Sequence, residues 1–184
     1  MQKVGSMSNK APRNMNHPVW NLYDTLKTAR LNVLYYEEKL HRAELMIMVM
    51  QITLAAAVPS SAIAGFKLWD FWLGEYAWEI FVLFSSFVAF IQPFLGLPKK
   101  SKKYSELVDG YKILYYDLQD IRQKIEEDKR YYSPHKNLFK AAKARRKELE
   151  VKETGIKLDK KLRKKLQEAV KKELPGEKFY LPPE

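Results

Sequence analysis

The sequence predicts an all-α protein with a two-span transmembrane helical hairpin that continues into a cytoplasmic antiparallel helical bundle. Two stretches, residues 45–66 and 80–98, hold no charged residue. As helices they would be roughly 33 Å and 28 Å long, against about 30 Å for the hydrocarbon core of a bilayer. Each stretch adjoins a heptad pattern of apolar residues, which is typical of packed helices.

Two buried helices in a soluble bundle are the alternative interpretation of these stretches. A core helix in a soluble chain of 184 residues normally keeps one charged face, and neither stretch has one. The connector between them is rich in amphipathic aromatic rings, which favour the headgroup layer. These are Trp69, Phe71, Trp72, Tyr76 and Trp78. The sequence therefore favours two membrane spans.

The flanking charges predict the orientation of the hairpin. Lys39 and Arg42 precede the first span, four lysines lie within residues 99–103, and the connector has one lysine against three acidic residues. Positive charge collects on the cytoplasmic side of membrane proteins. We therefore expect a multi-pass protein of the cell inner membrane with both termini in the cytoplasm.

The chain divides into three predicted parts: a mobile segment 1–19, a long helical hairpin 20–130, and a basic helical extension 131–184 with a proline-containing tail. Asn21, after Pro18, is expected to cap a continuous helix over 21–66. The candidate helix-packing seams follow heptad spacing before and after the spans. Their residues are Leu26, Val33, Leu40, Leu107, Leu114, Leu118 and Ile121. The seams could pack within one chain or pair subunits.

Two basic helices are expected after residue 131. Ser133-Pro134 should begin the first, which ends at Gly155, and Asp159 should cap the second. One face of the second helix is apolar. An extended tail follows, with three candidate residues for docking the tail. The face comprises Leu162, Leu166, Ala169, Val170 and Leu174, and the tail residues are Phe179, Tyr180 and Leu181.

The composition argues against an enzyme. The chain has no cysteine, so disulfides and thiol nucleophiles are excluded. His17, His41 and His135 are far apart and do not have metal-ligand spacing, and no phosphate-binding glycine loop occurs. We predict no catalytic residue, no cofactor and no metal.

The net charge of +11 lies mostly after residue 98. The basic helices there could present a solvated surface, attract anionic lipid, or bind nucleic acid. No recognisable nucleic-acid motif supports the third possibility, so nucleic acid is not an expected partner.

Polar and small residues in the spans are candidates for span packing or pore lining. They are Gln51, Thr53, Ser60, Ser61, Ser85 and Gln92. They could hold one hairpin together, or several hairpins could assemble as a homo-oligomer around a polar path. Neither span contains a charged residue that would suggest a proton relay or a voltage sensor.

The chain resembles the SLATT family of two-transmembrane effector domains associated with SMODS nucleotidyltransferases and SLOG sensors. The resemblance covers residues 20–184 and rests on four features. They are the helix TARLNVLYYEEKLHRAE entering the first span, the short aromatic connector, the exit helix KKSKKYSELVDGYKILYYDLQDIRQKI, and the tail LPGEKFYLPPE.

The resemblance implies an antiviral defence effector of prokaryotes that disrupts or permeabilises the inner membrane and causes growth arrest or cell death. A sensor or nucleotide-signalling protein encoded nearby would activate it. The family has no fixed catalytic set to carry over. The alternative function is a non-enzymatic membrane scaffold or anchor that recruits a cytoplasmic partner.

Overall fold

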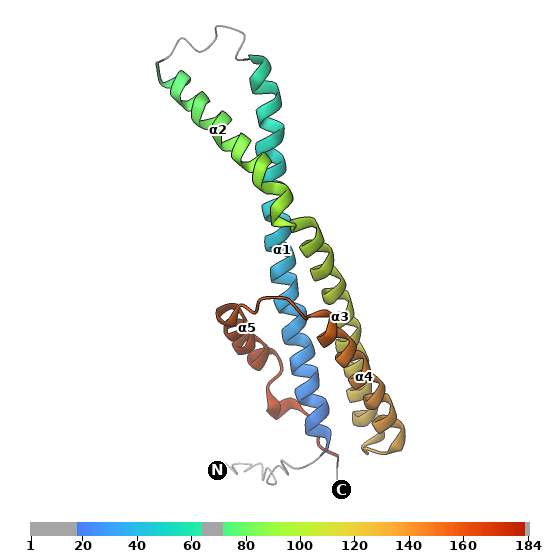
Figure 1. Ribbon diagram of the computed structural model, residues 1–184. Helices are drawn as coiled ribbons and strands as arrows, with labels where there is room; N and C mark the ends of the chain where they lie inside the picture. The colour runs from blue at the N-terminus through green and yellow to red at the C-terminus, as the bar shows by residue number, and fades with distance from the viewer. Residues whose placement is uncertain (1–17, 64–71, 183–184) are drawn as a thin grey trace, which may run out of the picture.

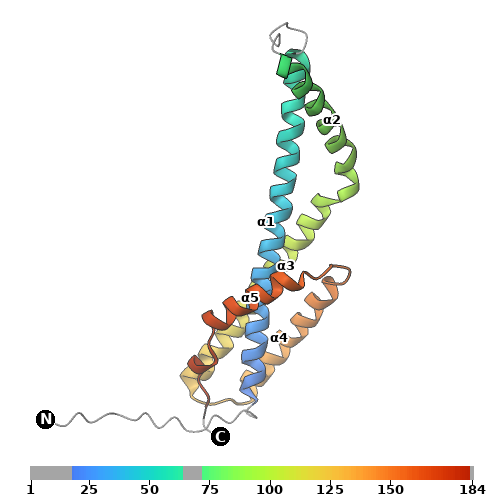
Figure 2. The same ribbon diagram turned by 90° about the vertical axis from the view of Figure 1, so that its left-hand side faces the viewer.

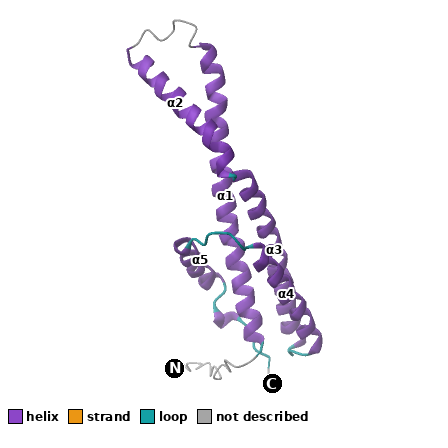
Figure 3. Ribbon diagram, viewed as in Figure 1, coloured by secondary structure: helices purple, strands orange, loops and turns teal. Residues whose placement is uncertain are grey.

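The computed structural model describes residues 18–63 and 72–182, and within these ranges every regular element is a helix (Figure 3). Side chains of residues 56–79, 81, 82 and 178 lie outside the description. The all-α prediction is confirmed. The predicted segment 1–19 falls almost wholly outside the described residues. The elements are α1 (Val19–Ile63), α2 (Trp72–Leu95), α3 (Leu97–Asp128), α4 (Ser133–Lys152), α5 (Lys160–Glu173) and the short 3-10 helix η1 (Gly176–Lys178).

The molecule is elongated, with a helical bundle at one end and the α1–α2 pair at the other (Figure 1). α1 and α3 run antiparallel along each other, α4 packs on α3, and α5 packs on another side of α1 (Figures 1 and 2). The connector between α4 and α5 passes across α1. The C-terminal α-helix, α5, therefore packs on α1, the first helix of the fold.

The two predicted seams form the core between α1 and α3. Leu26, Val33, Leu107, Leu114 and Leu118 are at most 1% exposed, and all belong to one buried cluster. Ile121 is buried in the same cluster, and Leu40 is half-buried at its edge. The seams thus pack against each other within a single chain.

Tyrosines extend this core toward the α1–α2 pair. The ring of Tyr36 in α1 lies between two rings of α3, with centroids 6.2 Å from Tyr104 and 5.9 Å from Tyr111. Stacked aromatic pairs at these distances add to the stability gained by burial. They hold α1 and α3 in register.

The start of α1 differs from the prediction. The helix begins at Val19, and the backbone N–H of Asn21 donates to the carbonyl of Pro18 at 3.3 Å. Asn21 lies inside the helix, where its carbonyl accepts a hydrogen bond from the Thr25 hydroxyl at 2.7 Å. The predicted Asn21 cap is therefore wrong, because the chain becomes helical directly after the proline.

Gly96 separates α2 from α3. Its φ of +55° is left-handed, a conformation that costs little only for glycine. Pro98 then stands at the second position of α3, where its missing N–H leaves no helical hydrogen bond unmade. The predicted span 80–98 therefore contains a helix boundary near its end.

The C-terminal elements follow the sequence except at the end of α4, where the prediction of Gly155 is wrong: the helix stops at Lys152, and Gly155, with a φ of +85°, lies in the turn that follows. The Asp159 carboxylate accepts from the backbone N–H of Leu162 at 3.0 Å and caps α5. Leu162, Val170 and Leu174 are buried as predicted, whereas Ala169 is exposed. The buried part of α5 is narrower than its apolar face, because the single helix α1 covers only part of that face.

Candidate functional site

The surface of α1 changes character beyond Ala43. Before it, the large apolar side chains are mostly buried; after it, large apolar side chains on α1 and α2 point outward. We call the exposed set the apolar band. It comprises Leu45, Met46, Met48, Val49 and Ile52 of α1, and Ile80, Leu83, Phe84, Phe87, Phe90 and Phe94 of α2.

Exposure in the apolar band is high, reaching 71% for Leu83 and 76% for Phe94. The band lies entirely within the two charge-free stretches of the sequence. Removing apolar surface from water is favourable by about 25 cal/mol per Å². Soluble monomers rarely expose contiguous apolar patches larger than a few hundred Å², and larger ones mark membrane or protein contacts. The band is thus a surface suited to an apolar environment.

The predicted polar residues of the spans occupy different environments. Gln51 is exposed and Gln92 is half-buried, and neither side-chain amide forms a hydrogen bond to a described residue. The hydroxyl of Thr53 donates to the carbonyl of Val49 at 2.9 Å, so its polarity is satisfied within α1. Ser60 and Ser61 belong to α1, but their side chains lie outside the described part.

Ser85 is the exception, because it is buried. It is 5% exposed, and its hydroxyl oxygen has no hydrogen-bond partner among the residues that the structure describes. Val88, three residues further on, is also buried, so the two share one face of α2. α2 thus packs through a narrow face that includes Ser85 and Val88 and leaves Phe84, Phe87, Phe90 and Phe94 outward.

The connector of residues 153–159 fastens the bundle below the apolar band. The Tyr111 hydroxyl donates to the Glu153 carboxylate at 2.5 Å, and the Lys103 ammonium donates to the Thr154 carbonyl at 3.0 Å. Burial raises the pKa of Tyr111, and its hydrogen bond to the carboxylate adds to the increase. The connector is therefore tied to α3 by a neutral phenol and a cation.

A second set of contacts joins the C-terminal tail to the start of α1. The Phe179 ring stacks on Tyr23, and the cations of Lys27 and Arg122 lie 5.0 Å and 5.3 Å from its centroid. Burial, followed by the Glu126 carboxylate, raises the pKa of Tyr23 to about 12. Phe179, a predicted docking residue of the tail, therefore packs in a site formed by Tyr23 and Lys27 of α1 and Arg122 of α3. The sequence offers no signal for this site, because its residues come from two helices that are distant in the sequence.

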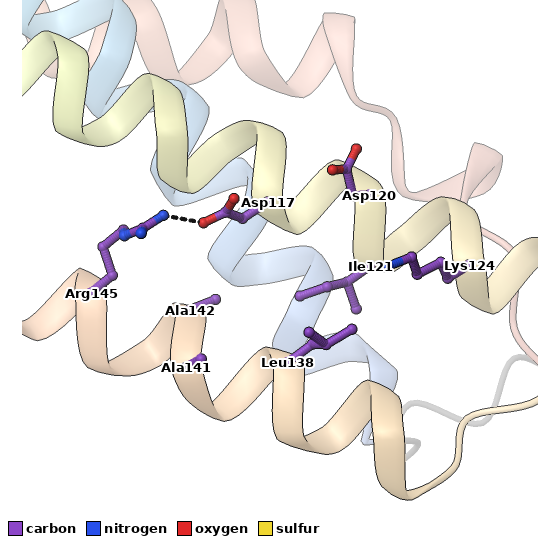
Figure 4. A pocket seen from close by; sticks show the side chains of 8 residues that line it. All are labelled: Asp117, Asp120, Ile121, Lys124, Leu138, Ala141, Ala142 and Arg145. Atoms are coloured by element: carbon purple, nitrogen blue, oxygen red, sulfur yellow. Dashed lines mark hydrogen bonds and ion pairs between the residues drawn. The ribbon is translucent and has the colours of Figure 1, made fainter.

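A surface groove lies between α3 and α4. It has a volume of about 250 Å³; the Arg145 guanidinium at its rim pairs with Asp117, and Asp120 points away from α4 (Figure 4). Leu138 and Ile121 form its apolar wall. A surface ion pair on an apolar wall is a packing feature, and the groove brings no nucleophile and base together.

His135 is the buried histidine of the bundle. It is 2% exposed, its Nε2 lies 3.1 Å from the Asp128 carboxylate, and its Nδ1 has no hydrogen-bond partner within the described ranges. Tyr132 also donates to Asp128, at 3.0 Å. These contacts join the end of α3 to the start of α4. Among the residues that the structure describes, no group of His, Cys, Asp and Glu side chains could hold a metal ion.

Within the described ranges, none of the helices combines the length and apolarity required of a membrane span. Comparison of the chain with protein-family models, with curated protein sequences and with solved structures finds no match.

Proposed function

We propose that this chain is a two-span protein of the cell inner membrane, with the apolar band in the bilayer and the helical bundle in the cytoplasm. We further propose that it is an effector of antiphage defence. Activated by a partner sensor or a nucleotide signal, several hairpins would associate and permeabilise the membrane, causing growth arrest or cell death.

The observation that carries the membrane proposal is the separation of two surfaces along α1. From Leu22 to Ala43, most apolar side chains are buried against other helices, while from Leu45 to Ile52 most are exposed, together with the α2 phenylalanines of the apolar band. Hydrocarbon is the environment that removes the cost of such exposure. The sequence continues the first charge-free stretch to Phe66, beyond the described part of α1.

Two features support an effector over an inert anchor. The exposed Gln51 amide is costly to leave facing lipid, and association of hairpins would give it partners. The resemblance to SLATT effectors links this architecture to membrane disruption. The alternative, a scaffold that anchors a cytoplasmic partner, requires only that the hairpin insert.

The test begins with insertion. Membranes from expressing cells are washed with alkaline carbonate, which strips peripheral proteins. The full chain should remain in the pellet because its band contacts hydrocarbon. Release into the supernatant would overturn the membrane proposal.

The second step measures membrane potential with a voltage-sensitive dye, while growth is followed in cells expressing the chain alone and with its genomic neighbours. Depolarisation should precede growth arrest in the activated combination. Gln51→Leu with Gln92→Leu should abolish depolarisation. Gln123→Leu with Gln167→Leu, at two exposed positions of the bundle, is the matched control and should depolarise normally. A membrane-inserted chain that never changes the potential would favour the scaffold.

A further inference from the structure

We propose that the lysines at the band-facing end of the bundle bind the phosphate headgroups of anionic phospholipids in the adjoining leaflet. This inference rests on the proposed membrane insertion and names the lipid class that the bundle recognises. The residues, which we call the basic collar, come from the first turns of two helices. They are Lys99, Lys100 and Lys102 of α3, and Lys160, Lys161, Lys164 and Lys165 of α5.

The start of α5 lies close to the apolar band. The Asp159 carboxylate is 4.0 Å from the Lys39 ammonium, and the Asp159 backbone N–H donates to the Tyr35 hydroxyl at 2.8 Å. Lys39 precedes Leu45, the first residue of the band, by six residues, or about 9 Å along a helix. The first turns of α5 are therefore within about one Debye length of a bilayer surface placed at the band.

α5 then crosses α1 obliquely, and its last turn lies farther from the apolar band than its first turn (Figures 1 and 2). Its last turn carries Lys171 and Lys172, at the end far from α2. The other part of the collar, on α3, follows Gly96 directly and so lies at the edge of the band. Two helices that are distant in sequence thus both present cations, with those of α3 nearer the band than those of α5 (Figures 1 and 2).

A groove of about 590 Å³ lies between α1 and α5, and its lining residue Arg42 precedes Leu45, the first residue of the band, by three residues. It is lined by two apolar and five charged side chains. They are Leu162, Leu166, Glu38, Arg42, Asp159, Lys161 and Lys165. An apolar floor with cations at its rim matches a phospholipid, whose phosphate is anionic and whose glycerol and upper acyl carbons are apolar.

The acidic groups of this groove are already engaged. Glu38 accepts from the Arg42 guanidinium at 2.8 Å, and Asp159 caps α5 beside Lys39. Lys161 and Lys165 form no ion pair with any residue that the structure describes. Two uncompensated ammonium groups therefore face a groove that opens next to the band.

Position favours lipid over nucleic acid as the occupant. A polyanion in solution could bind any basic face, including Lys171 and Lys172, whereas a headgroup reaches only the end beside the band. Each lysine near an anionic leaflet contributes about fivefold to affinity. The collar should therefore discriminate strongly between anionic and zwitterionic lipid.

The experiment uses the full chain in a neutral detergent, titrated with phosphatidylglycerol or phosphatidylcholine of the same acyl chains and followed by native mass spectrometry. The unmodified chain should bind phosphatidylglycerol at least about tenfold more tightly than phosphatidylcholine. Lys160→Gln, Lys161→Gln, Lys164→Gln and Lys165→Gln together should remove that preference. The matched control neutralises four other exposed lysines: Lys140, Lys147, Lys171 and Lys172.

Several results would overturn the inference. Equal affinity for the two lipids would do so, as would equal losses in the collar and control variants. Glycerol phosphate or a short RNA that displaced phosphatidylglycerol at similar concentration would identify a soluble anion instead. Carbonate extraction of membranes from cells that express the same variants separates the two proposals. A chain that resists extraction yet shows no lipid preference disproves the collar alone, while an extracted chain disproves the insertion on which it rests.

Discussion

The ring of Phe179 stacks on the ring of Tyr23, with centroids 4.1 Å apart and planes 6° from parallel. The Tyr23 hydroxyl also donates to the Tyr180 carbonyl at 2.5 Å. The C-terminal tail is thereby fixed to the first turns of α1. Arg122, whose guanidinium lies over Phe179, adds α3 to the same contact.

Replacing Phe179 by Ala should lower the free energy of unfolding by about 3 kcal/mol, because a buried ring and its stacking partner are lost together. Chemical denaturation of the full chain in detergent, followed by near-ultraviolet circular dichroism, would measure this. Leu181→Ala, at a half-buried position of the same tail, is the control and should cost less. Equal losses would mean that the stacked ring has no special part in docking.

Gly110→Ala should destabilise the bundle even though alanine favours helices by about 1 kcal/mol. A Cβ at position 110 would overlap the Cδ2 of the buried Leu149 in α4, and overpacking of this kind costs about 1–3 kcal/mol. Leu149→Ala provides the space. In that background Gly110→Ala should become stabilising, and the double-mutant cycle should show strong coupling. A single Gly110→Ala variant more stable than the parent would contradict the close approach of α3 and α4.

Asp159 should make α5 sensitive to acid. The hydrogen bond from the Leu162 N–H, and then the nearby Lys39 and Arg42 cations, hold the pKa of its carboxyl below the ordinary 3.8. A carboxyl whose pKa is lower in the folded state stabilises above its unfolded pKa, and that contribution disappears as the pH falls through the folded value. Asn caps a helix as Asp does but does not titrate.

Hydrogen exchange of the α5 amides, measured as a function of pH, would test this. At neutral pH the parent should protect α5 better than Asp159→Asn. The difference should begin to shrink near pH 3.8, the ordinary pKa, and should vanish only once the pH is below the lower pKa of the folded state. Asp159→Ala should expose α5 more than either at every pH, because it loses the cap as well. A parent-to-Asn difference that is unchanged by acid would show that the carboxylate charge contributes nothing.

Ser85→Ala should leave the hairpin as stable as the parent, or slightly more so, because the buried hydroxyl has no hydrogen-bond partner in the described part of the chain. Ser85→Leu should disrupt the packing of α2, since the site is 5% exposed and has no room for a larger side chain. Thermal unfolding in detergent distinguishes the two variants. If Ser85→Ala abolished depolarisation as the Gln51 and Gln92 substitutions are expected to do, Ser85 would belong to a polar path.

Much of the helical architecture could be predicted from local pattern. The heptad spacing around Leu26 and Leu114 specified which faces of α1 and α3 are apolar, because spacings of three and four residues place side chains on one side of a helix. Asp159 identified the start of α5, since a carboxylate satisfies the free N–H groups of a first turn. Both signals lie within a few residues of the element that they specify.

The sequence alone determined that the chain is helical, which faces are apolar and which stretches lack charge, because these follow from residues close together in the chain. It left open whether the seams pair within one chain, and it missed Gly110 as a point of close approach between α3 and α4. Only the tertiary structure brought Phe179 to Tyr23 and Arg122, and Lys161 to the groove beside Arg42. Contacts between distant segments depend on how whole helices pack, and no local pattern encodes the partner.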